Sequence, residues 1–83
     1  MYEIKSVINF DYIATVEKIA KLQYMLEHVR LSKTDFQRTV ENISVYREQC
    51  ISFLLFYFNK TMSESIQELE IDIFEYLYNH KMR

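Results

Sequence analysis

Side chains that commonly do chemistry are scarce in this 83-residue chain, which has two histidines, His28 and His80, and one cysteine, Cys50. Zinc and di-iron sites need several ligands at fixed spacings, and no HExxH, ExxH or CxxC pattern occurs. A nucleophilic cysteine needs an activating base, whereas Cys50 stands in an apolar segment and is expected to be a small buried hydrophobe. We therefore expect no catalytic residue, no metal, no cofactor and no enzymatic activity.

Carboxylates are the polar groups with the most regular spacing. No basic residue lies between Thr61 and Tyr78, and the acidic residues of that segment are Glu64, Glu68, Glu70, Asp72 and Glu75. In a helix, residues 64, 68, 72 and 75 share one face. Such a stripe is either an ordinary solvated surface or a docking strip for the basic surface of another protein. We take the second interpretation as a hypothesis, with Glu64, Glu68, Asp72 and Glu75 as the docking residues.

Aromatic residues are concentrated in the segment 50–58, which is apolar on nearly every side of a helix. A helical segment without a polar face is expected to be enclosed by several neighbours. One interpretation is a core that continues into a homodimer interface, and the other is a surface that docks the helix of a different protein. The first is favoured, with a self-association interface formed by Phe53, Phe56, Tyr57 and Phe58.

Several basic residues are expected near the link between the first two helices: Lys18, Lys21, Arg30, Lys33 and Arg38. A helix-turn-helix protein reads DNA with polar side chains near the N-terminus of its recognition helix. Lys33, Gln37 and Arg38 fit that description and define the alternative function, a small DNA-associated transcriptional regulator. Against it, Asp35 and Glu41 interrupt the basic residues, and a formal net charge of -2 is low for a nucleic-acid-binding protein.

The elements that must position these side chains follow from a composition with no glycine and no proline. Without either residue, the chain has few sites for a left-handed backbone or a rigid turn, which favours long helices joined by short links. Ser32 is expected to cap the second helix, with Asp35 completing a capping box. Asn59 suits a left-handed helix end, and Thr61 with Glu64 has capping-box spacing.

The predicted fold is all-α, an antiparallel three-helix bundle that is dimeric and has helices at about 3–30, 33–58 and 62–81. Ser63 competes with Thr61 as the cap of the last helix. The first helix could begin at residue 3 or after a cap at Asn9 or Asp11. Apolar residues three and four positions apart from Ile4 onward favour one long helix.

Length and composition bound the remaining expectations. The 83 residues are expected to form one domain, residues 1–83, and a hydrophobic content of 49% favours self-association as a way to bury the excess. A lone cysteine and the lack of a signal or membrane-spanning segment favour the cytoplasm. Abundant Ile, Asn, Tyr, Lys and Phe suggest a bacterial or phage origin. The predicted function is a small non-enzymatic interaction protein: an inhibitor, adaptor or immunity-type factor.

Overall fold

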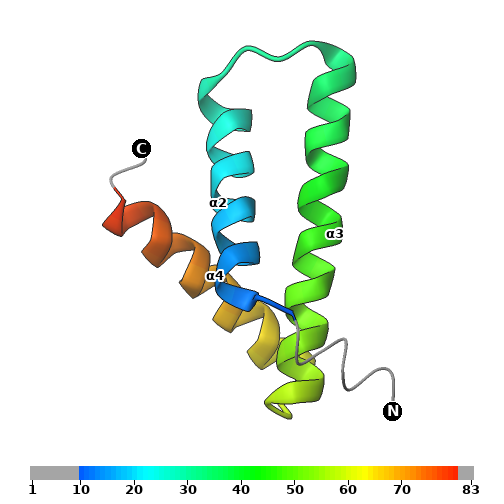
Figure 1. Ribbon diagram of the computed structural model, residues 1–83, viewed down its shortest axis with the longest axis vertical. Coiled ribbons are helices and arrows are strands. Elements are labelled where there is room, and N and C mark those ends of the chain that lie inside the picture. The colour runs from blue at the N-terminus through cyan, green and yellow to red at the C-terminus, as the bar shows by residue number, and fades with distance from the viewer. Residues whose placement is uncertain (1–9, 81–83) are drawn as a thin grey trace.

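The computed structural model describes residues 10–80, which form a bundle of three α-helices (Figure 1). The helices are α2, Tyr12–His28; α3, Lys33–Tyr57; and α4, Met62–Asn79. The helices α2 and α3 run antiparallel side by side, and α4 packs obliquely against both of them at the end where α3 finishes. The predicted all-α fold with three helices is confirmed.

The helix α2 begins later than predicted, because Asp11 acts as its N-cap. Asp11 has an extended backbone, with φ -95° and ψ 93°, and its carboxylate accepts a hydrogen bond of 3.0 Å from the Ala14 N–H. The side chain thus binds an N–H group that a continuing helix would have bonded to a backbone carbonyl. The prediction of one helix over 3–30 is wrong at Asp11 and at its last two residues, since α2 ends at His28. Residues 3–9 of that prediction lie outside the described residues.

The link between α2 and α3 is capped by Ser32, as predicted. Its hydroxyl accepts a hydrogen bond of 3.1 Å from the Asp35 N–H. Within residues 10–80, however, the Asp35 carboxylate makes no return bond to Ser32, so the predicted capping box is only half formed. Aspartate is one methylene shorter than the glutamate that usually completes this motif, which accounts for the missing bond.

The link between α3 and α4 follows the predicted pattern more closely. Asn59 has φ 57°, the left-handed conformation that ends helices when glycine is absent. Thr61, rather than Ser63, is the N-cap of α4. Its N–H donates to the Glu64 carboxylate at 2.9 Å and its hydroxyl accepts from the Glu64 N–H at 3.1 Å, so this capping box is complete. The predicted ends of these helices are residues 58 and 81. In the structure, α3 ends at Tyr57 and α4 ends at Asn79.

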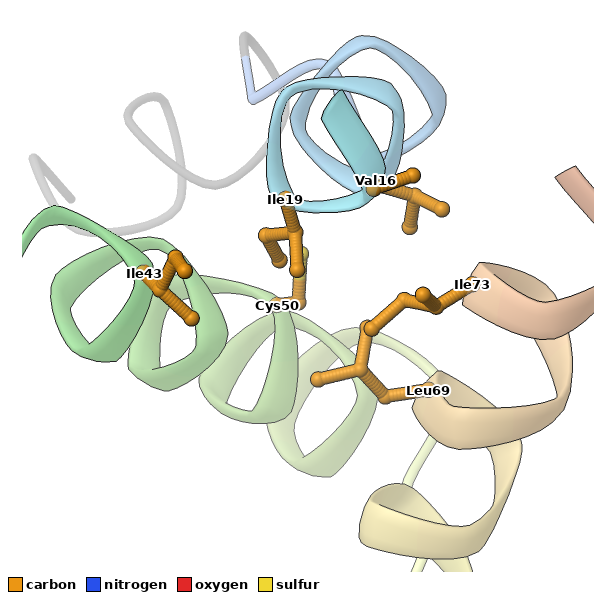
Figure 2. Packing of buried hydrophobic residues seen from close by; sticks show 7 residues of the cluster. Val16, Ile19, Ile43, Cys50, Leu69 and Ile73 are labelled. Atoms are coloured by element: carbon orange, nitrogen blue, oxygen red, sulfur yellow. The ribbon is translucent and has the colours of Figure 1, made fainter. Parts of the chain in front are cut away.

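The core lies where the three helices meet. Its buried apolar residues are Val16, Ile19 and Ala20 of α2, Ile43, Cys50 and Leu54 of α3, and Leu69 and Ile73 of α4. Figure 2 shows Ile19 directed toward Cys50, while Leu69 and Ile73 enter from the side of α4. Ile19, Cys50 and Leu69 have no exposed surface, so the expectation that Cys50 is a small buried hydrophobe is confirmed.

Candidate functional site

A groove of about 580 Å³ opens where the beginning of α2, the end of α3 and the middle of α4 come together. We call it the α2–α4 groove, and it is lined by Tyr12, Ile13, Val16, Leu54, Phe58, Lys60, Glu68, Asp72, Glu75 and Tyr76. Val16 and Leu54 are buried and form its floor, whereas Ile13 and Phe58 are exposed. Three carboxylates of α4 line the same groove, which therefore combines an apolar floor with an anionic rim.

One of these carboxylates, Asp72, has a structural role. It accepts a hydrogen bond of 2.6 Å from the Tyr12 hydroxyl, which joins α4 to the first turn of α2. Burial of the phenol and this hydrogen bond together raise the pKa of Tyr12 well above its ordinary value. Tyr12 is a groove residue that sequence reasoning missed, because no local signal links two residues that are 60 positions apart.

The other two carboxylates of the groove, Glu68 and Glu75, are more available for binding a partner than Asp72 is. The Lys60 ammonium lies 3.7 Å from the Glu68 carboxylate, which is an ion pair at a distance too long for a hydrogen bond. Among the described residues, no hydrogen bond or ion pair engages Glu75. Lys60 was also missed from the sequence, although its position beside the left-handed Asn59 places it at the start of the link.

The fourth predicted docking residue, Glu64, does not line the groove. Its carboxylate accepts the Thr61 N–H in the capping box, and that hydrogen bond is the main reason that the pKa of Glu64 lies below its ordinary value. The helix end therefore uses this side chain. The predicted set is divided into a capping residue (Glu64), a helix-joining residue (Asp72) and two carboxylates of the groove rim (Glu68 and Glu75).

Phe53 is the centre of an aromatic cluster within the chain. The centroid of its ring lies 5.3 Å from that of Phe10, 5.6 Å from Tyr12, 5.1 Å from Tyr57 and 5.5 Å from Phe58. Such spacings are typical of favourable aromatic pairs. Phe53 is half-buried by these neighbours, so a large part of its surface is covered by its own chain.

The other three predicted interface residues remain exposed, with 78% of Phe56, 53% of Tyr57 and 56% of Phe58 accessible. Phe58 lines the α2–α4 groove. Phe56 lines a second, more open groove of about 460 Å³ beside Phe10 and Val45. The aromatic segment thus contributes to two grooves, between which the rings of Phe53 and Phe58 are in contact.

The basic residues near the α2–α3 link are less concentrated than the sequence suggested. The Lys21 ammonium lies 3.1 Å from the Glu17 carboxylate, and the Lys18 ammonium lies 5.5 Å from the centroid of the Tyr46 ring. The alternative DNA-contacting residues Lys33, Gln37 and Arg38 are all exposed on the first turns of α3. Asp35 is exposed among them, which reduces the positive potential of that surface.

The thiol and the imidazoles occupy separate environments. Cys50 has no exposed surface, and burial raises the pKa of its thiol to about 12, so the thiol stays protonated near neutral pH. One ring nitrogen of His28 lies 3.8 Å from Glu27, and the His80 Nδ1 lies 2.9 Å from the Tyr76 carbonyl oxygen. Residues 10–80 contain no group of three or more His, Cys, Asp and Glu side chains placed to hold a metal ion.

Comparisons of the chain with protein-family models, with curated proteins and with solved structures found no match. No helix in the described part of the chain has the length and apolar character needed to cross a membrane. The α2–α4 groove combines an apolar floor with the exposed Phe58 and a carboxylate rim.

Proposed function

We propose that the protein is a non-enzymatic interaction module that binds another protein through the end of the molecule where α3 finishes. This role is that of an inhibitor, adaptor or immunity-type factor. The supporting observation is the α2–α4 groove, where exposed Ile13 and Phe58 stand beside the carboxylates of α4. An apolar centre with a charged border is the usual anatomy of a protein-protein interface.

The charge of this surface indicates the charge expected on the surface of the partner. Among the residues at positions 10–80 that line the groove, Lys60 is the single basic residue beside the carboxylates of Glu68, Asp72 and Glu75. A basic surface would be attracted to such a rim and oriented by it. Because Asp72 joins two helices and Glu64 caps α4, the proposal assigns docking to Glu68 and Glu75, and these two can be changed with little effect on folding.

Affinity capture from the natural host tests this proposal. Tagged wild-type protein, a Glu68→Lys/Glu75→Lys variant and a Glu27→Lys/Glu41→Lys control are compared by mass spectrometry. The control carries the same change of charge outside the groove. We expect one protein to be recovered with the wild type and the control, and to be lost with the groove variant. Equal recovery with all three would contradict a role for the rim.

We propose, in addition, that two copies of the chain associate through the surface around Phe56. Its side chain is 78% exposed beside the second groove, whose lining combines the apolar residues Phe10, Val45 and Phe53 with the polar residues Glu48, Gln49 and Ser52. Complete burial of a phenylalanine side chain contributes about 1.5–3 kcal/mol, and a symmetric dimer gains this contribution twice. Tyr57 and Phe58 lie at the edge of the same helix end.

Size-exclusion chromatography with light scattering at tens of micromolar tests the self-association. We expect the wild type to have the mass of a dimer and Phe56→Ser to have the mass of a monomer. Phe36→Ser is the matched control, because Phe36 is an exposed phenylalanine at the opposite end of α3. A monodisperse wild-type monomer, or a Phe56→Ser variant that remains a dimer, would contradict the proposed interface.

A further inference from the structure

The two available carboxylates of the α2–α4 groove have a defined spacing. Glu68 and Glu75 are seven residues apart on α4, which is two helical turns, or about 10.5 Å along the axis. Residues at this spacing lie on the same side of a helix. The rim therefore presents two negative charges in a row parallel to α4.

Lys60 shows how a cation is held at this rim. Its ammonium lies 3.7 Å from Glu68, and its side chain is 34% exposed. At that distance the carboxylate oxygens of Glu68 keep their capacity to accept hydrogen bonds from an incoming donor. The rim can therefore bind further positive charge. Glu68 and Glu75 can each accept hydrogen bonds from a separate arginine.

Whereas the rim of the groove suits basic side chains, the inner part of the groove suits apolar side chains. Val16 and Leu54 at the base are apolar, and Ile13, which stands beside them, is 72% exposed. Because Val16 and Leu54 are already buried, the apolar surface that an occupant would cover is that of Ile13 and Phe58. The walls are helices and offer no strand edge, so the occupant must satisfy its own backbone hydrogen bonds, as a helix does.

We propose that the α2–α4 groove receives one helix of a partner protein, and that this helix carries two basic residues seven positions apart with apolar residues between them. The basic side chains bind Glu68 and Glu75, and the apolar side chains cover Ile13 and Phe58. This proposal rests on the proposed protein-binding function and specifies the chemistry of the partner. It also predicts that the spacing of the charges in the partner matters, and not only their number.

The probe is a synthetic, alanine-based helical peptide of about 18 residues, long enough to be partly helical in water. It carries two arginines seven positions apart and two leucines between them. The control peptide has the same composition with the arginines five positions apart, so that they point to different sides of the helix. Binding is followed by amide chemical shifts of the isotope-labelled protein and by titration calorimetry at low and high salt.

We expect the first peptide to shift the amide signals of groove residues such as Ile13, Val16 and Glu75, and to bind about tenfold more tightly than the control peptide. A Glu68→Gln/Glu75→Gln variant should lose about tenfold in affinity, and Glu27→Gln/Glu41→Gln should lose less than about twofold. Unchanged spectra elsewhere in the variants verify that they are folded. Added salt should weaken the binding.

Equal affinity for the two peptides, or shifts outside the groove, would overturn the proposal. So would groove signals that shift with protein concentration alone, since a second copy would then be the occupant. If the host protein captured above is still lost with Glu68→Lys/Glu75→Lys while the peptides bind equally, the helix proposal fails and the protein-binding function stands. If the first peptide binds as expected but no host protein is recovered with the wild type, the protein-binding function fails.

Discussion

The two links of the helical bundle differ in how completely they cap the ends of the helices that they join. At one end, residues 29–32 join α2 to α3, and Ser32 supplies a single capping bond. At the other, residues 58–61 join α3 to α4 with a left-handed Asn59 and a full capping box at Thr61. Neither link uses glycine or proline. The more completely capped link is the one beside which the third helix packs (Figure 1).

This difference has a consequence for function. A binding surface needs side chains held by well-packed elements. At the α3–α4 end, the buried residues Val16 and Leu54 form the floor of the groove. At the α2–α3 end, Val29 and Phe36 remain about half exposed. The α2–α4 groove therefore lies at the end of the bundle where α4 packs against both α2 and α3.

The largest effect is expected from core truncations at the two ends. Leu69 is completely buried between three helices, so Leu69→Ala should lower the free energy of unfolding by about 2–5 kcal/mol. Leu26, near the end of α2, is only partly buried, and Leu26→Ala should cost less than half as much. Urea unfolding followed by circular dichroism measures both values. Equal losses would show that the two ends are equally well packed.

High pH should act on the α3–α4 half of the molecule. Burial raises the pKa of the Cys50 thiol from its ordinary 9.0 to about 12, so the folded protein holds this proton more tightly than the unfolded chain. The stabilisation is complete below about pH 9 and is lost as the pH rises toward 12. The raised pKa of Tyr12 acts in the same direction at higher pH.

Urea unfolding at several pH values between neutrality and about pH 11 measures this loss, and Cys50→Ala is the control. The variant should lose less stability than the wild type over the same range, because the contribution of the thiol is absent while those of groups such as Tyr12 and Tyr76, whose pKa values are also raised, remain. A parallel decline of the two proteins would contradict a protected thiol. In the folded wild type, a thiol reagent should react slowly near neutral pH and rapidly once urea unfolds the chain.

The sequence predicted the local features of the fold well. The caps Ser32 and Thr61 and the left-handed Asn59 were all identified correctly, because capping depends on residues within one turn of each other. The continuous first helix was wrong at Asp11, where apolar periodicity outweighed the signal of a capping aspartate. The spacing of apolar residues shows which side of a helix is apolar. It does not show where the helix begins, because the same spacing can continue into the residues before the cap.

The groove could be predicted only in part. Helical spacing placed Glu68, Asp72 and Glu75 on one side of α4, and these three line the groove. The partner of Asp72 is Tyr12, which is far away in the chain, so its structural role depends on how α4 packs against α2. The division of Phe56 and Phe58 between two grooves likewise depends on packing, which spacing along one helix does not encode.

Removal of the caps should have an intermediate effect. Thr61→Ala is expected to destabilise the protein by about 1–2 kcal/mol, and Ser32→Ala by about 0.5–1 kcal/mol, within the usual range for N-cap substitutions. The larger value follows from the reciprocal bonds between Thr61 and Glu64, whereas Ser32 makes a single capping bond. Thermal and urea unfolding compare the two variants. A greater loss with Ser32→Ala would reverse the proposed ranking of the two links.

The smallest effect concerns the backbone of the links. Asn59 has φ 57°, so Asn59→Gly should keep or slightly raise the stability, whereas Asn59→Ala should lower it by about 1 kcal/mol. Val29 has φ -116°, a region that suits any residue, and Val29→Gly should be destabilising by about 0.5–1 kcal/mol because glycine adds freedom to the unfolded chain. The same replacement by glycine thus has opposite outcomes at the two ends. A similar loss at both positions, measured by urea unfolding, would mean that the left-handed conformation of Asn59 contributes nothing to the difference between the links.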